Sequence, residues 1–121
     1  MWTVIVDGNN IFQALDVSGD PTSAAAEQFL QKLERTAVMK DWEVIVVFDG
    51  RPRFLPRETG PLTVRYAAVR QTADSVIERL VYQLEDKNSV IVVTQDHSEA
   101  NIVLGCGARV WSSNRLLEEM E

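Results

Sequence analysis

Three short runs of β-branched residues recur along the chain, and each is followed within a few residues by an aspartate. The runs are VIV before Asp7, VIVVF before Asp49 and VIVV before Asp96. A continuous run of valine and isoleucine is typical of a parallel strand that is buried on both faces. In an open α/β sheet, ligands bind outside the carboxyl ends of such strands. We therefore expect these three aspartates to emerge at one edge of a sheet.

The rest of the chain alternates helical patterns with these strands. Strands are expected at 2–6, 43–48, 90–94 and 108–111, with a weaker one at 62–66. Apolar residues recur at helical spacing at 22–39, 73–84, 96–104 and 113–120. Thr22 or Ser23 and Thr72 are candidate N-caps for the first two helices. Strands that alternate with helices predict an α/β fold with a mostly parallel sheet, covered on both faces.

Length and composition restrict the class of protein. A chain of 121 residues has room for one domain, which we place at 1–121. Cys106 is the single cysteine, so neither an intrachain disulfide nor a zinc cage is expected, and a reducing compartment fits. No apolar run approaches the roughly 18 residues of a membrane span. We expect a cytoplasmic protein that has no membrane partner.

The charge of the chain is unevenly distributed. The net charge of −6 argues against a general nucleic-acid coat. The segment 50–70, however, contains five arginines against one glutamate, so it carries +4 and the remainder −10. Such a segment can bind phosphates, or its arginines can simply solvate the long loop that the prolines and glycines of 50–61 predict. The five candidate phosphate-binding residues are Arg51, Arg53, Arg57, Arg65 and Arg70.

A fourth aspartate joins the three that follow strands. Asp74 begins the helix expected at 73–84, and crossover helices start at the edge where the preceding strand ends. All four carboxylates can therefore converge there. Hard cations such as Mg²⁺ and Mn²⁺ choose carboxylate oxygens, and they support hydrolysis of a phosphodiester. Asp7 is the best candidate for a central ligand, because Gly8 permits a tight turn and the Asn10 amide can orient a water or a phosphate.

Each of the four aspartates also has a structural interpretation. Asp7 can be an ordinary turn residue, and Asp49 can make the Asp-Gly turn that leaves its strand. Asp74 favours the helix dipole whether or not it binds a metal. Asp96, with Glu99 three residues later, matches a capping box.

Two further titratable residues lie near these aspartates in the sequence. Glu78 follows Asp74 by one helical turn, which places both carboxylates on one face. His97 is the only histidine and could act as an acid or base. The sequence leaves open whether either residue takes part.

The ordered set of motifs resembles a known family. The segments VDGNN, VVFDG, TADSVIERL, VVTQDHSEAN and GARVWSSNRL are similar to those of the YacP-like NYN domains, members of the PIN-like nuclease superfamily. The resemblance implies a three-layer α/β/α fold and a divalent-metal ribonuclease site. It matches Asp7, Asn10, Asp74 and Asp96 to the core acidic and amide set, and Asp49 to an accessory acid. Ala73 stands where related domains can carry a second acid, so the number of metals is left open.

These observations predict a divalent-metal-dependent endoribonuclease. Asp7, Asp74 and Asp96 would bind Mg²⁺ or Mn²⁺, with Asn10 and Asp49 in support. The five arginines would contact RNA, and Phe54 and Tyr66 could stack on bases. Similar bacterial proteins act on messenger RNA at the ribosome, which makes the ribosome a conceivable partner.

Other functions are compatible with parts of the same sequence. The main alternative is a non-catalytic RNA- or ribosome-binding module that keeps the fold. A receiver-like phosphorylation switch fits poorly, because Ser112 and Ser113 stand where such a domain needs a lysine. An aspartyl phosphatase would want a second aspartate where Asn9 stands. The oligomeric state is not predicted.

Overall fold

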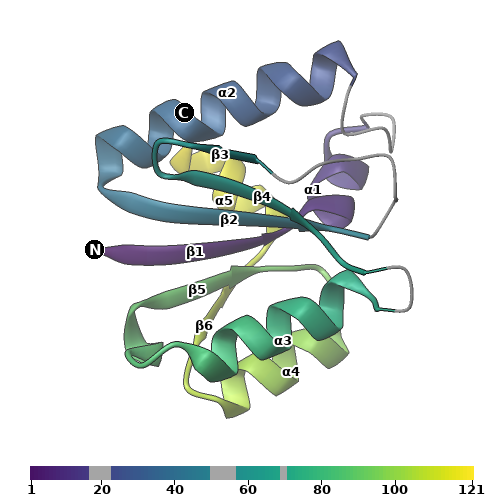
Figure 1. The fold of residues 1–121 in the computed structure, drawn as a ribbon, viewed down its shortest axis with the longest axis vertical. Coiled ribbons are helices and arrows are strands. Elements are labelled where there is room, and N and C mark those ends of the chain that lie inside the picture. Colours follow the sequence, from purple (N-terminus) through teal and green to yellow (C-terminus); the bar gives the residue numbers. More distant parts are fainter. Residues whose placement is uncertain (17–22, 50–56, 69–70) are drawn as a thin grey trace.

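A six-stranded sheet lies between two layers of helices in the computed structural model, which describes residues 1–16, 23–49, 57–68 and 71–121 (Figure 1). The strands are β1 (Trp2–Asp7), β2 (Trp42–Phe48), β3 (Arg57–Thr59), β4 (Leu62–Tyr66), β5 (Val90–Val93) and β6 (Arg109–Trp111). The helices are α1 (Gly8–Ala14), α2 (Ala24–Lys40), α3 (Ala73–Gln83), α4 (His97–Gly105) and α5 (Ser113–Glu119), with a 3-10 turn at Lys87–Ser89. The expected α/β/α class is confirmed.

Strand β1 occupies the middle of the sheet. The strand order is β3-β4-β2-β1-β5-β6, and every pair is parallel except β3 with β4. Asp7 at the end of β1 is in register with Val47 of β2, and its neighbour Val6 is in register with Val93 of β5. The carboxyl ends of these three strands therefore meet at one edge, as the sequence predicts.

The alternation of residues along β1 divides the core into two parts. Val4 and Val6 pack in the cluster that α1, α2 and α5 cover, whereas Ile5 packs in the cluster under α3 and α4. Each of these side chains is fully buried, and burying one contributes about 1.5–3 kcal/mol. Because both faces of the sheet are covered, the central strands carry uninterrupted apolar runs over most of their length, and functional groups are left to the ends of the strands.

Helix α1 was not expected from the sequence. We predicted a tight turn at Gly8, but the chain enters a helix there, because Ile11 and Phe12 become fully buried in the core. Gly8 is needed for a different reason from the one we expected. A Cβ atom at this position would lie 2.4 Å from the ring of Phe48, so only glycine lets α1 approach β2 this closely.

The arginine-rich segment is partly a hairpin. We expected a long loop over 50–61, and this prediction is wrong for the last residues of the segment. There, β3 pairs antiparallel with β4 through a turn at Gly60, whose φ is 58°. Glycine suits this left-handed conformation. Arg57 lies in β3, and Arg65 is an exposed residue near the carboxyl end of β4. Residues that fall outside the described part of the chain are Arg51, Arg53, Phe54 and Arg70.

Two helix starts follow the sequence closely. The hydroxyl of Ser23 accepts a hydrogen bond from the Ala26 amide at 3.2 Å, and that of Thr72 accepts one from the Ser75 amide at 3.2 Å. These are N-caps of α2 and α3, as predicted. Among the described helices, none combines the length and the apolar composition that crossing a bilayer requires.

Candidate functional site

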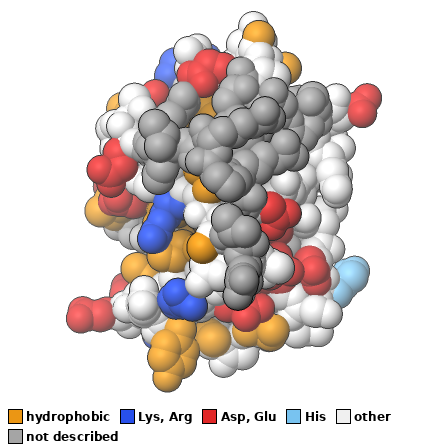
Figure 2. All heavy atoms as spheres, turned by 45° about the vertical axis from the view of Figure 1, so that its right-hand side comes forward, with side chains coloured by type: hydrophobic (Ala, Val, Ile, Leu, Met, Phe, Trp, Pro, Cys, Tyr) orange, Lys and Arg blue, Asp and Glu red, His pale blue; other side chains and the backbone are white. Residues whose placement is uncertain are grey.

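Three carboxyl groups meet at the carboxyl-end edge of the sheet. They belong to Asp7 at the end of β1, Asp74 in the first turn of α3 and Glu99 in the first turn of α4. One oxygen from each lies within 4.8 Å of the others. Asp7 is 3% exposed and Glu99 1%, while Asp74 is half-buried. We call these three residues the acidic cluster. Acidic side chains also gather beside the single histidine on the face that Figure 2 shows.

Asp7 serves as a helix cap and as a member of the cluster. Its Oδ1 atom accepts a hydrogen bond from the Asn10 amide at 3.3 Å, which caps α1. Burial raises the pKa of Asp7 to about 6; the hydrogen bond from Asn10 opposes this rise, and the charges of Asp74 and Asp49 add to it. The structural and the functional interpretation of Asp7 are therefore compatible, because one oxygen is enough for the cap.

Glu99 is the most strongly perturbed member of the cluster. The Thr94 hydroxyl donates a hydrogen bond to its Oε2 at 2.9 Å, whereas its buried Oε1 has no hydrogen-bond partner among the described residues. Burial raises the pKa of Glu99 to about 8, with further contributions from the charges of Asp74 and Asp7. A buried carboxylate oxygen without a partner is costly, and such a group invites a functional explanation.

Asp96 begins α4 in the way that the sequence predicts, but the capping box is not formed. Its Oδ1 accepts hydrogen bonds from the amides of Ser98 at 2.8 Å and Glu99 at 3.2 Å. The Asp96 amide donates to the Thr94 hydroxyl at 3.1 Å instead of to the Glu99 carboxylate. The capping box requires a hydrogen bond from the Asp96 amide to the Glu99 carboxylate, and this part of the prediction is wrong, because the Glu99 side chain turns inward to Thr94. A metal-ligand role for Asp96 stays a prediction, since its carboxylate is outside the acidic cluster.

Asp49 connects the end of β2 to the start of α3. Its backbone amide donates to Asn9 Oδ1 at 3.0 Å, and its own Oδ1 accepts from the Ala73 amide at 3.0 Å. Ala73 immediately precedes Asp74, so this bond fixes the first turn of α3 against the sheet. Asp49 is exposed and raises the pKa of Asp7 through its charge. These contacts fit the supporting role that we predicted for it.

Asn10 connects α1 to the end of β5. Its Oδ1 accepts a hydrogen bond from the Gln95 amide at 2.7 Å and lies 3.4 Å from the Thr94 hydroxyl. The Thr94 hydroxyl has one proton to donate. Its contact with Glu99 Oε2 is shorter than its contact with Asn10 Oδ1, so the hydrogen bond to Glu99 is the stronger one. The side-chain nitrogen of Asn10 is not used in these bonds, so it can donate to a ligand.

Glu78 and His97 remain outside the acidic cluster. Glu78 is half-buried on α3, one turn beyond Asp74. His97 is the exposed first residue of α4, and with Gln95 and Asp96 it lines a hollow of about 240 Å³. Neither residue belongs to the one group of metal-ligating side chains found among the described residues. Tyr66, a predicted base-stacking residue, stacks on Phe48 with ring centroids 5.7 Å apart.

The donor atoms of the acidic cluster suit a divalent cation. All three are carboxylate oxygens, which Mg²⁺ and Mn²⁺ prefer. The unpartnered Oε1 of Glu99 and the raised pKa values both indicate that the described residues do not compensate a negative charge on these carboxyl groups, which a bound cation would do. The residues present therefore fit such an ion.

Glu99 is the site residue that sequence reasoning missed. The signal was ambiguous, because a glutamate three residues after an N-cap aspartate is typical of a capping box. Its inward orientation depends on Thr94 and on the neighbouring start of α3. Neither can be read from the local sequence.

Comparisons with known proteins agree with this architecture. The family model of the YacP-like NYN domain matches residues 4–121. The chain is 29% identical over 126 residues to the uncharacterized protein YacP of Bacillus subtilis, which covers 98% of this chain and 74% of the relative. Crystal structures of Rae1 (YacP) from Bacillus subtilis superpose with TM-scores of 0.80 for a W164L mutant and 0.79, both at 28% identity. They cover 99% of this chain and 75% and 74% of the solved chains.

Proposed function

Because the chain belongs to the YacP-like NYN domain family, which is nuclease-like, we propose that it is a divalent-metal-dependent endoribonuclease with its active centre at the acidic cluster. The observation that carries this proposal is Glu99 Oε1, a buried oxygen without a described partner beside two further carboxylates. A protein that used this edge only for structure would not need to bury that oxygen unpaired.

Asp7, Asp74 and Glu99 would hold Mg²⁺ or Mn²⁺. When bound, such an ion lowers the pKa of a water and offsets charge on a phosphodiester undergoing hydrolysis. Thr94 keeps Glu99 in place through its hydroxyl, and Asp49 keeps Asp74 in place through the Ala73 amide. Asp96 remains a further candidate ligand, since it caps the helix whose first turn carries Glu99.

Asn10 would orient the substrate or the attacking water. Its carbonyl oxygen is anchored to the end of β5, so the amide group is held in one orientation before a ligand arrives. Holding a donor in place in advance lowers the cost of binding a phosphate oxygen. Asn10 is therefore both a structural link and a candidate contact to RNA.

The arginines would contribute affinity for RNA. Arg65 is exposed near the carboxyl end of β4, next to the strand that leads to Asp49. Its guanidinium would meet phosphates, which carry no sequence information. Arg51, Arg53, Arg57 and Arg70 are proposed for the same role on sequence grounds. We further propose cytoplasmic messenger RNA as the substrate, with the ribosome as a conceivable partner, from the resemblance described above.

The alternative is a non-catalytic RNA- or ribosome-binding module. It shares the fold and the basic segment, and differs only in the chemistry of the acidic cluster. RNA that is bound but left uncut in the presence of Mn²⁺ would favour this alternative.

A cleavage assay tests the proposal directly. Labelled RNA is incubated with the protein and Mn²⁺, with and without EDTA, beside Asp74→Asn and the matched control Glu78→Gln on the same helix. We expect EDTA to stop cleavage and Asp74→Asn to reduce its rate by roughly 100-fold or more, because even residues around metal ligands contribute about 10–100-fold. Glu78→Gln should cut at nearly the parent rate. Equal rates for both variants would contradict the assignment of Asp74.

A further inference from the structure

All three tryptophans of the chain line one pocket, whose lining contains no residue of the acidic cluster. Trp2 and Trp42 are register partners at the starts of β1 and β2, and Trp111 ends β6. The pocket has a volume of about 430 Å³, and Ile91 contributes to its wall. We call it the tryptophan pocket. Trp2 and Asp7 lie at opposite ends of β1, roughly 17 Å apart at the rise of a strand. Trp111 lies nearer to the carboxyl-end edge, because it is in register with Val93 of β5.

The tryptophan pocket also concentrates positive charge. Lys40, Arg109 and Arg115 line it together with a single acid, Glu119. Outside the segment 50–70 the chain has only seven lysines and arginines, so three of them gather here. A net positive pocket in a chain of net charge −6 selects for an anionic ligand.

The cations and the indole rings already contact one another. Arg115 lies over Trp111 with 4.7 Å between the guanidinium carbon and the ring centroid, and Arg109 lies over Trp2 at 5.2 Å. The indoles of Trp42 and Trp111 meet edge to face at 5.8 Å. These contacts place the two guanidinium groups over the faces of two indoles. Aromatic and guanidinium planes together with positive charge are the combination that binds bases and phosphates of single-stranded nucleic acid.

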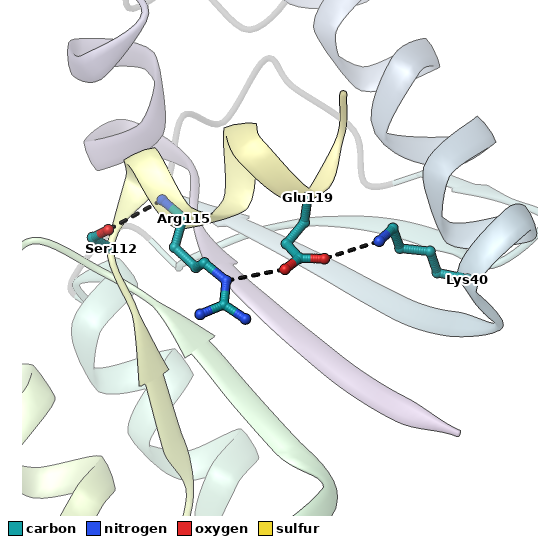
Figure 3. A network of polar contacts seen from close by, with 4 residues as sticks. All are labelled: Lys40, Ser112, Arg115 and Glu119. Atoms are coloured by element: carbon teal, nitrogen blue, oxygen red, sulfur yellow. Dashed lines mark hydrogen bonds and ion pairs between the residues drawn. The ribbon is translucent and has the colours of Figure 1, made fainter.

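The ion pairs of the pocket leave donors available. Glu119 accepts from Lys40 Nζ at 2.9 Å and from Arg115 Nε at 3.0 Å, so it links α5 to α2 (Figure 3). The two terminal nitrogens of Arg115 point away from Glu119 in this view and take no part in that bond. The Arg115 side chain is 52% exposed, and Arg109 is exposed as well. Both guanidinium groups can therefore meet a phosphate without breaking the network.

We propose that the tryptophan pocket is a second RNA-binding site, which takes one nucleotide of a single strand by stacking its base on the aromatic and guanidinium planes that line the pocket and pairing its phosphate with Arg109 or Arg115. The choice of RNA as the source of this nucleotide rests on the proposed function. The aromatic and cationic lining of the pocket is independent of it. A strand held here would be anchored outside the acidic cluster.

Tryptophan fluorescence reports on this pocket alone, because the chain has no other tryptophan. The protein is titrated in EDTA, where no RNA is expected to be cut, with short oligoadenylate, adenosine monophosphate and inorganic phosphate. We expect oligoadenylate to quench the emission strongly, adenosine monophosphate to do so more weakly, and phosphate to leave it unchanged. Arg109→Gln should weaken oligoadenylate binding about tenfold, the factor that one charge-assisted hydrogen bond supplies.

Arg35→Gln is the matched control, because it removes the same charge from an exposed position of α2 outside the pocket. If Arg109→Gln does not fold, Arg115→Gln replaces it. The proposal is overturned if oligoadenylate leaves the emission unchanged, if phosphate or the free nucleotide binds as tightly, or if both arginine variants weaken binding equally. If the emission depends on the protein concentration and not on the RNA concentration, the tryptophan pocket is a self-association surface, and the proposal is overturned as well. Cleavage of RNA by a protein without this quenching would refute the second site and leave the proposed function intact.

Discussion

The acidic groups at the two ends of the sheet have different electrostatic surroundings. At the carboxyl end, burial and mutual repulsion raise the pKa values of Asp7 and Glu99 to about 6 and about 8. At the other end, Glu119 accepts hydrogen bonds from Lys40 and Arg115, which hold its pKa below the ordinary value. The first site gathers like charges, and the second pairs unlike ones.

This difference indicates that the acidic cluster lowers the stability of the metal-free protein, as a site that binds a cation can do. Two unit charges 4 Å apart repel by roughly 4 kcal/mol at an effective dielectric constant near 20, so the acidic cluster weakens the metal-free fold. Sites of this kind persist because function requires them. The tryptophan pocket bears no such penalty, because Glu119, the one acid among its described lining residues, is partly exposed and paired with Lys40 and Arg115. We therefore expect the two ends to respond differently to pH, to metal ions and to neutral substitutions.

The largest expected effect is the pH dependence of the metal-free protein. The folded state binds the protons of Asp7 and Glu99 more tightly than the unfolded chain, whose carboxyl pKa values are 3.8 and 4.5. This contribution to stability is complete below about pH 4 and is lost as the pH rises toward 8. In EDTA, the free energy of unfolding should fall by several kcal/mol over that range, because one pKa unit corresponds to about 1.4 kcal/mol. Urea denaturation at several pH values measures it, and Glu99→Gln should flatten the curve. An unchanged slope in this variant would contradict the assignment.

The second expected effect is stabilisation by a divalent ion. An ion that binds the folded state alone raises the free energy of unfolding by about 2.7 kcal/mol at a concentration 100 times its dissociation constant. Melting curves at pH 8 with Mn²⁺, Mg²⁺ or EDTA test this. Asp74→Asn should lose most of the gain, whereas Glu78→Gln should keep it. Equal gains in all three proteins would place the ion elsewhere.

The smallest expected effect separates the two ends directly. In EDTA at pH 8, Asp7→Asn should leave the protein equally stable or more stable by about 1–3 kcal/mol, because it removes one repelling charge and keeps an acceptor for the Asn10 amide. The same variant should lose RNA cleavage. Glu119→Gln, the control at the other end, should shift the melting temperature little and slightly downward, since exposed ion pairs contribute little. A destabilised Asp7→Asn variant that still cuts RNA would make Asp7 a structural residue.

Local patterns in the sequence were sufficient for most of the elements and for their common edge. Uninterrupted valine and isoleucine runs indicate strands buried on both faces, and their order with the intervening helices specifies a parallel sheet. The position of Asp7 and Asp74 at one edge follows from that topology, because parallel strands and crossover helices meet there. The caps at Ser23 and Thr72 were predictable too, since their hydrogen bonds stay within one helical turn.

Contacts between distant segments decided the rest. Helix α1 forms because Ile11 and Phe12 fill the core, and the Gly8 position is set by the ring of Phe48, forty residues away. Glu99 joins the cluster because the Thr94 hydroxyl turns it inward, although its spacing from Asp96 favours a capping box. The three tryptophans meet only when β1, β2 and β6 assemble in one sheet. The sequence determined which chemical groups reach each edge, because backbone periodicity is local, whereas the tertiary structure decided which of them touch.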